Sequence, residues 1–214
     1  MSELNQLFEN NRRWVAQMTA SDPGFFQKLS GQQAPKYLWI GCADSRVPAN
    51  QIVGLLPGEL FVHRNISNVV AEGDVNCLSV IQYAVDVLQV RHIIVCGHFG
   101  CGGVEAALED RKIGLADEWL RHVCAVRDKH REQLSSLKKV MRWNRLCELN
   151  VIEQVMHVAQ SGILQGAWGR QQKVSIHGVI YAVDNGLLRD LGVTISRSEE
   201  TSQRYEAALR QIAA

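Results

Sequence analysis

Two short segments that lie far apart in the chain carry side chains able to bind a metal ion. Residues 42–46 read Cys-Ala-Asp-Ser-Arg, and residues 98–103 read His-Phe-Gly-Cys-Gly-Gly. Together they offer two thiols, one imidazole and one carboxylate, which form a plausible tetrahedral zinc set. The arginine of the first segment can pair with the carboxylate through two hydrogen bonds. Such a pair would decide whether the carboxylate closes the metal site, as in a structural centre, or leaves one position open for catalysis.

The spacing within the second segment suits a single metal ion. His98 and Cys101 are separated by two residues, so one tight loop can direct both side chains at the same ion, and Gly100 frees the backbone for that turn. For His98 or Cys101 alone, an ordinary turn with a buried cysteine is the simpler interpretation. With Cys42 and Asp44 included, the ligand types and their spacing favour metal binding.

Both segments follow short apolar runs that predict buried strands, at residues 37–41 and 92–97. Other patterns predict strands at 60–64, 174–181 and, through a hairpin, 191–195, and helices at 3–18, 75–88, 144–160 and from residues 103 and 198 onward. Strands that alternate with helices indicate an α/β fold with a mostly parallel central sheet flanked by helices, preceded by an N-terminal helical arm over residues 1–35. Ligands bind such sheets beyond the carboxyl ends of the strands, so we expect the two segments to converge at one edge.

The composition indicates a globular chain and excludes several classes of protein. The 214 residues are 46% hydrophobic and 21% charged, enough for one domain, residues 1–214, with a sizeable core. The net charge of +1 gives no general attraction for nucleic acid, and no apolar run is long enough to span a membrane. The N-terminal residues do not form a secretory signal, so we expect a cytoplasmic protein. In that compartment the six cysteines favour metal binding over disulfides, and Cys77, Cys96 and Cys147 lie on apolar patterns typical of core thiols.

From about residue 22 to residue 191 the chain resembles the β-class carbonic anhydrases, and the segments at 42–46 and 98–103 carry that resemblance. The resemblance implies one Zn²⁺ ion per chain, held by Cys42, His98 and Cys101, with water, hydroxide or Asp44 in the fourth position. It implies reversible hydration of carbon dioxide to bicarbonate and a proton through zinc-bound hydroxide, in a homodimer or homotetramer. Arg46 would hold Asp44 off the metal, where the carboxylate can accept a hydrogen bond from the nucleophile.

The same resemblance implies a substrate pocket and a regulatory site. The pocket, formed partly across a dimer interface, would be lined by Gln33, Phe61, Ile66, Tyr83 and Gly102. A second bicarbonate site would be built from Trp39, Arg64 and Tyr181, and acidic pH or bicarbonate would favour an inactive state with Asp44 bound to zinc. Judged by residue type alone, each pocket position is equally well explained as ordinary core or surface. Without the resemblance, Trp39 and Tyr181 are better explained as core residues and Arg64 as the partner of a carboxylate.

Two other functions remain open. A related zinc hydrolase acting on another small cumulene, such as carbon disulfide, would use the same ligands and differ in access to the pocket. A non-enzymatic module would have its zinc permanently closed by Asp44 as a fourth protein ligand. The intact pair of Asp44 and Arg46 favours a catalytic site, because a structural site has no need of a gate.

Overall fold

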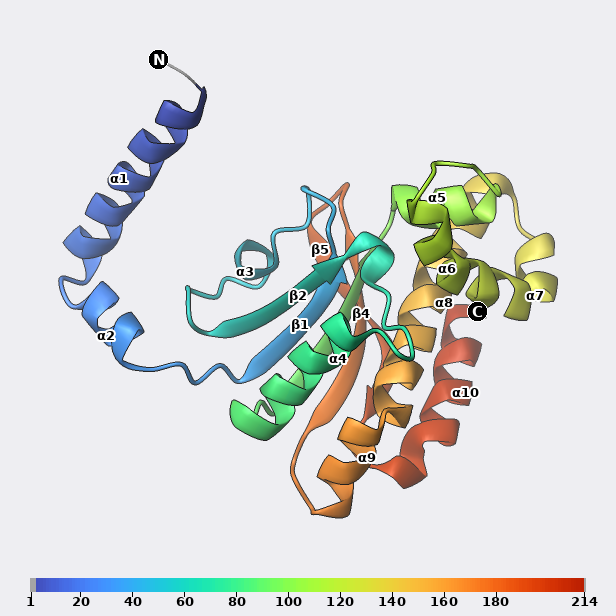
Figure 1. Cartoon of the computed structure of the whole chain (residues 1–214). Helices are drawn as coiled ribbons and strands as arrows, with labels where there is room; N and C mark the ends of the chain where they lie inside the picture. Colours follow the sequence, from blue (N-terminus) through green and yellow to red (C-terminus); the bar gives the residue numbers. More distant parts are fainter. Residues whose placement is uncertain (1–2, 214) are drawn as a thin grey trace. The chain divides into compact units, whose positions relative to one another are not determined.

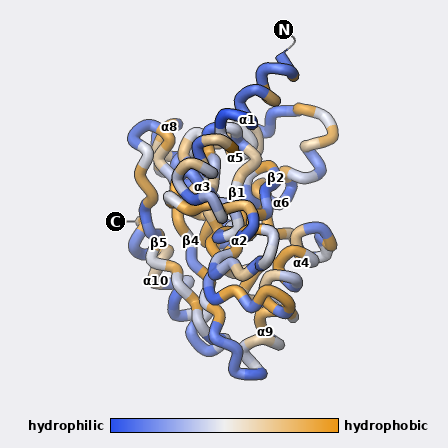
Figure 2. Tube along the Cα trace, turned by 90° about the vertical axis from the view of Figure 1, so that its left-hand side faces the viewer, coloured by the Kyte–Doolittle hydropathy of each residue, from blue (hydrophilic) through white to orange (hydrophobic). Residues whose placement is uncertain are grey.

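The computed structural model describes residues 3–213 and separates two compact units, with the division between Ala34 and Pro35. The first unit contains helices α1 (Glu3–Ser21) and α2 (Phe25–Gly31). The carboxylate of Asp22 stabilises the turn between them, because it accepts hydrogen bonds from the Gly24 N–H at 3.0 Å and from Lys28 Nζ at 2.8 Å. No residue of α1 is buried, and Figure 2 shows its trace coloured mostly as hydrophilic. The N-terminal helix is thus confirmed, whereas the assignment of residues 1–214 to a single domain stays a prediction.

The second unit is built on a five-stranded sheet with the order β2-β1-β3-β4-β5 (Figure 1). Its strands are β1 (Tyr37–Cys42), β2 (Leu60–Asn65), β3 (His92–His98), β4 (Ser175–Ala182) and β5 (Leu187–Ile195). The first four run parallel, and β5 pairs with β4 in the antiparallel direction. The predicted mostly parallel sheet is therefore confirmed, and β1 and β3 are neighbours whose carboxyl ends lie at the same edge.

Helices make up much of the rest of this unit. They are α3 (Ala49–Ile52), α4 (Val75–Gln82), α5 (Gly102–Leu108), α6 (Ala116–Lys129), α7 (Arg131–Ser135), α8 (Lys139–Gln160), α9 (Gly162–Gly169) and α10 (Thr201–Ala213). The predicted helix at 75–88 ends in a π-helical turn, Tyr83–Val87, and α8 begins earlier than the predicted residue 144. Between residues 3 and 213, no helix has both the length and the apolar character that a membrane span requires.

The sheet separates two hydrophobic cores of unequal size. Leu38, Ile40 and Cys42 point from β1 into the larger core, together with buried residues of α4, α5, α6, α8, α9 and α10. The intervening Trp39 points to the opposite face, where it packs with residues of α3 and Cys96. Because side chains alternate along a strand, Cys42 faces the side of the sheet from which α5 begins. This alternation positions the first cysteine for the site described next.

Candidate metal centre

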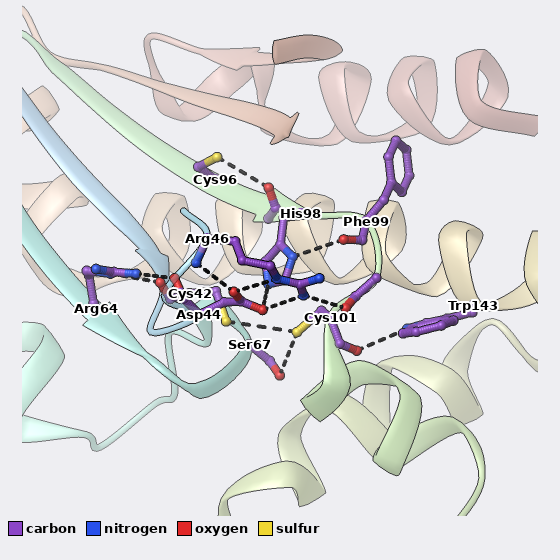
Figure 3. Close-up of polar contacts among 12 residues, drawn as sticks. Cys42, Asp44, Arg46, Arg64, Ser67, Cys96, His98, Phe99, Cys101 and Trp143 are labelled. Carbon is purple, nitrogen blue, oxygen red and sulfur yellow. Dashed lines mark hydrogen bonds and ion pairs between the residues drawn. The ribbon is translucent and has the colours of Figure 1, made fainter. Parts of the chain in front are cut away.

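The structure brings together three predicted ligands at the carboxyl edge of the sheet (Figure 3). Cys42 is the last residue of β1, His98 is the last residue of β3, and Cys101 directly precedes α5. All three are buried, and their ligand atoms lie within 4.8 Å of one another. The two Sγ atoms are 3.9 Å apart. A tetrahedral zinc ion with Zn–S bonds of about 2.3 Å would separate its two sulfurs by about 3.8 Å, so the observed spacing fits.

The loop after β3 orients the histidine for metal binding. His98 Nδ1 lies 3.0 Å from the carbonyl oxygen of Phe99, to which it can donate a hydrogen bond. The Phe99 N–H in turn donates to the Tyr181 carbonyl of β4 at 3.0 Å, and Gly100 turns the chain with a φ of 70°. His98 Nε2 is buried and has no hydrogen-bond partner among residues 3–213. A buried nitrogen in that condition is expected of a metal ligand whose other nitrogen is held by a carbonyl.

The two thiols differ in charge in the absence of a cation. The hydrogen bond from Cys101, whose sulfur is 3.9 Å away, lowers the pKa of Cys42 well below its usual value, against the effect of burial. The hydrogen bond to Cys42 and burial raise the pKa of Cys101 well above its usual value. The pair therefore retains one proton, which a divalent metal would displace.

The remaining cysteines behave as core residues. Burial raises the pKa of Cys77 and of Cys147 to about 12, and it raises the pKa of Cys96 further. Cys124 is only partly buried, and none of the six cysteines, all of which lie within residues 3–213, forms a disulfide. A thiolate ligand is thus favoured at Cys42 and disfavoured at these other positions.

Asp44 is held beside the cluster by Arg46. The guanidinium binds the carboxylate at two points, with Nε 2.9 Å from Oδ1 and Nη2 2.7 Å from Oδ2, and Nη2 also donates to the Gly100 carbonyl at 3.2 Å. These hydrogen bonds hold the pKa of Asp44 well below its usual range, despite the opposing effect of burial. Oδ2 lies 3.7 Å from His98 Nε2. The carboxylate is therefore ionised and close to the ligand atoms while it remains paired with Arg46.

Of the three candidate regulatory residues, Arg64 contacts the loop that follows β1. Arg64 donates from Nε to the Cys42 carbonyl at 2.8 Å and from Nη2 to the Asp44 carbonyl at 2.6 Å. The indole Nε1 of Trp39 is buried and has no hydrogen-bond partner among residues 3–213. Tyr181 packs against the same small core as Trp39 and pairs in register with His98. Arg64 thus supports the backbone on either side of Ala43, next to the first ligand.

The candidate pocket residues fall in both units. Phe61 and Tyr83 stack with ring centroids 5.9 Å apart, and Ile66 and Tyr83 are 43% and 45% exposed. Gly102 is the first residue of α5, directly after the ligand Cys101. Gln33 is exposed and belongs to the first unit, whereas the other four belong to the second.

Two residues beside the ligands are not identified by the sequence analysis. Ser67 Oγ lies 3.6 Å from Cys101 Sγ, and Trp143 Nε1 donates to the Cys101 carbonyl at 3.0 Å. They come from the turn after β2 and from α8, outside both metal-binding segments. No spacing rule in the sequence connects them to the ligands, because only the folded chain brings them there.

Comparisons with known proteins agree on one family. A family model described as carbonic anhydrase matches residues 37–188. A carbonic anhydrase of Emericella nidulans is 47% identical over 190 residues, which cover 88% of this chain and 83% of that protein. Among solved structures, a Coccomyxa β-carbonic anhydrase in complex with acetazolamide has a TM-score of 0.91 at 41% identity, covering 95% of this chain and 92% of that one. A tetrameric β-carbonic anhydrase of Sordaria macrospora has a TM-score of 0.86 at 38% identity, covering 90% and 98% of the two chains.

Proposed function

The chain belongs to the β-class carbonic anhydrases and is an enzyme of that family; we propose that it hydrates carbon dioxide reversibly at one Zn²⁺ ion held by Cys42, His98 and Cys101. The observation that carries this proposal is a cluster of three candidate ligands beside a fourth, Asp44, whose carboxylate is hydrogen-bonded to Arg46 at both oxygens. Three protein ligands with one open position are typical of catalytic zinc, and four protein ligands are typical of structural zinc.

The donor atoms of the cluster suit zinc. Two sulfurs at 3.9 Å and one buried imidazole nitrogen without a partner among residues 3–213 match the ligand types and spacing of a tetrahedral site. The Phe99 carbonyl fixes the His98 ring, so binding requires little rearrangement. When bound, Zn²⁺ would act as a Lewis acid that lowers the pKa of water toward neutrality and so supplies a nucleophile for carbon dioxide.

We assign Asp44 the role of a fixed hydrogen-bond acceptor. Because Arg46 binds both carboxylate oxygens and keeps the pKa of Asp44 low, the group stays ionised at neutral pH. From its position near His98 Nε2 it can accept a hydrogen bond from the nucleophile and so direct the lone pair of the nucleophile toward the substrate. Arg46 contributes by preventing the carboxylate from becoming a fourth ligand.

Carbon dioxide is small and apolar, so its pocket needs apolar walls more than polar groups. We propose Phe61, Ile66 and Tyr83 as those walls, with Gly102 and Gln33 completing the pocket partly across a dimer interface. The exposure of Ile66 and Tyr83 supports this arrangement, because exposed apolar side chains are available to a second copy of the chain. The tetrameric state given for the Sordaria macrospora enzyme supports a homodimer or homotetramer.

We further propose that bicarbonate regulates the enzyme through Arg64, together with Trp39 and Tyr181. A guanidinium binds a planar oxyanion through two hydrogen bonds, and the buried indole N–H of Trp39 offers another donor. Arg64 donates hydrogen bonds to the carbonyls of Cys42 and Asp44. A bicarbonate ion bound to the guanidinium would compete with these two hydrogen bonds and so loosen the loop that carries Asp44. Asp44 would then be released to bind zinc, and acidic pH would favour the same inactive state.

The substitution Asp44→Asn tests the catalytic assignment against a structural zinc. We expect the variant to retain one zinc ion per chain and to hydrate carbon dioxide about 10²-fold more slowly, because it loses an ionised acceptor. Asp86→Asn is a matched control, since Asp86 pairs with Arg170 on the surface, and both quantities should be unchanged. Loss of zinc or of thermal stability in Asp44→Asn would instead indicate a structural site closed by Asp44.

The alternative substrate is tested with the same preparation. A related hydrolase would consume carbon disulfide faster than it hydrates carbon dioxide. Parallel assays on zinc-loaded protein therefore distinguish the two activities without any substitution. Turnover of carbon disulfide alone would exclude the proposed substrate.

A further inference from the structure

Ser67 lies beside the candidate ligand Cys101 and contacts its sulfur. The residue is fully buried, and its Oγ is 3.6 Å from Cys101 Sγ. We propose that Ser67 is a positioning residue for the thiolate ligand Cys101, with its hydroxyl donating a hydrogen bond to that sulfur. This inference rests on the proposed function, because it concerns the thiolates that would hold the zinc.

The conformation of Ser67 is the first support for this role. Its φ of 64° and ψ of 27° are left-handed, and the next residue, Asn68, has a φ of 48°. Residues with a Cβ rarely adopt this region, and glycine adopts it without penalty. A turn that needed only the backbone shape would be served better by glycine. A serine in this position therefore indicates a role for the hydroxyl group. Among the described residues, the hydrogen-bond partner of that hydroxyl is the sulfur of Cys101.

Buried side chains of α8 hold the strained turn in place. Asn150 Nδ2 donates to the Ser67 carbonyl at 2.8 Å, and Gln154 Nε2 donates to Asn150 Oδ1 at 3.1 Å. Gln154 Oε1 accepts the Val70 N–H at 2.8 Å. Both α8 side chains are almost completely buried. A turn fixed at both ends by buried hydrogen bonds can keep a left-handed serine directed at a ligand.

Gly103 provides the space that the hydroxyl occupies. A Cβ at this position would lie 2.3 Å from Ser67 Oγ and 2.9 Å from Ile66 Cγ2, so any larger residue would push the turn away from the site. The first turn of α5 and the turn after β2 therefore approach closely at the point where Ser67 meets Cys101.

The chemical consequence concerns two sulfurs that lie 3.9 Å apart and would both be negative with zinc bound. Like charges at this distance repel each other, and the hydrogen bond from Ser67 to Cys101 stabilises one of the two thiolates. The same bond fixes the direction from which the Cys101 sulfur would meet the ion. Groups that orient metal ligands in this way typically change metal affinity 10–100-fold when they are removed.

Two substitutions separate the hydroxyl from the backbone. Ser67→Ala removes the hydroxyl and keeps the penalty of a left-handed residue with a Cβ, whereas Ser67→Gly removes the hydroxyl and relieves that penalty. We expect both variants of the full chain to bind Zn²⁺ about 10–100-fold more weakly than the parent, measured by competition with a chromophoric chelator. In the Co²⁺-loaded proteins the thiolate-to-metal charge-transfer band should move to lower energy in both variants, because an unbonded thiolate gives up an electron more easily. Ser79→Ala is the control, since that hydroxyl donates to the Asn76 carbonyl on an exposed part of α4.

The outcomes are distinct. Parent-like zinc affinity and an unshifted Co²⁺ band in Ser67→Gly would overturn the proposal, because the backbone alone would then be sufficient. A parent protein that binds zinc but does not hydrate carbon dioxide would overturn the proposed function, and the affinities of the two variants would still decide the role of Ser67. A parent protein that binds no zinc would overturn both.

Discussion

Replacing Glu153 with glutamine should destabilise the fold and change how its stability depends on pH. The Glu153 carboxylate is almost completely buried on α8, where it accepts hydrogen bonds from Lys129 Nζ at 2.8 Å, His130 Nε2 at 2.7 Å and the Tyr205 hydroxyl at 2.6 Å. These contacts join the end of α6 and the helix α10 to α8, which also carries the side chains that hold the turn at Ser67. The substitution removes the charge at the centre of this network and keeps the volume of the side chain.

The size of the effect follows from the pKa of the carboxyl group. Burial alone would raise it, but the hydrogen bonds from His130, Lys129 and Tyr205 outweigh burial and lower the pKa of Glu153 from 4.5 to about 2. A difference of that size corresponds to about 3 kcal/mol at neutral pH. The side chain is only 5% exposed, so solvent screening reduces this value little, and we expect a loss of roughly 2–3 kcal/mol.

The sign of the pH dependence is fixed by the direction of the shift. A carboxyl group whose pKa is lower in the folded state stabilises the protein fully above its unfolded pKa, and that contribution disappears as the pH falls through the folded pKa. The free energy of unfolding of the parent exceeds that of Glu153→Gln, and this difference should shrink by about 1 kcal/mol between about pH 7 and pH 3.5. Most of the rest should disappear as the pH falls to the folded pKa.

Urea unfolding followed by circular dichroism at about pH 7, 5 and 3.5 measures this difference, with a chelator present so that metal loss does not contribute. Glu118→Gln is the control, because Glu118 is 71% exposed and pairs with Arg121 of the same helix. The stability of this variant should not differ measurably from that of the parent. A difference below about 0.5 kcal/mol at neutral pH, or one that stays constant into acid, would refute this account of the network.

Three further predictions concern the metal site. The affinity for Zn²⁺ should rise about tenfold per pH unit between about pH 6 and pH 8, because Cys42 is already ionised there and Cys101, whose pKa is raised, must release its proton on binding; a pH-independent affinity would contradict the shared proton. Removing zinc with a chelator should lower the thermal midpoint, since free zinc at 100 times its dissociation constant stabilises the fold by about 2.7 kcal/mol, and an unchanged midpoint would show that this cluster does not bind the ion. Arg64→Ala should raise the inhibition constant for bicarbonate at least about tenfold, the loss of one charge-assisted pair, whereas unchanged inhibition would eliminate the regulatory role.

The sequence predicts the sheet and the convergence of the three candidate ligands because both depend on local patterns. The apolar runs before Cys42 and His98 predict buried strands, and the rule that ligands collect at the carboxyl edge then predicts that Cys42, His98 and Cys101 converge, as they do in the structure. The hairpin strand also forms, although β5 begins at Leu187, earlier than predicted. In each case a few consecutive residues contain the whole signal.

Features that depend on distant contacts are not predictable in the same way. Asn150, Glu153 and Gln154 have the polar character of surface residues, yet they are buried on α8 because their partners come from other elements. Ser67 has none of the glycine or asparagine signature of a left-handed turn, and only the contacts with α8 and Cys101 explain its backbone. Helices α6 and α9 are not among the predicted elements, and both pack on the larger core.

The stretch from Arg127 to Arg145 shows how the fold uses its charged residues. The structure distributes these residues over α6, α7 and the start of α8, and the side chains of Arg131 and Lys139 are solvent-exposed. Arg127 pairs with Asp110 and Asp128, and Lys139 pairs with Glu109. The basic residues are therefore largely neutralised within the chain, in line with the balanced total charge.

Stopped-flow measurement of carbon dioxide hydration tests the central claim most directly. The zinc-loaded protein would be assayed from about pH 6.5 to pH 9, the range that brackets the pKa that zinc gives to water, with the metal-free protein as control. The account predicts rapid hydration that requires zinc and falls steeply on the acid side, where Asp44 is expected to leave Arg46 and close the site. A zinc-loaded protein that does not accelerate hydration at any pH in this range would contradict it.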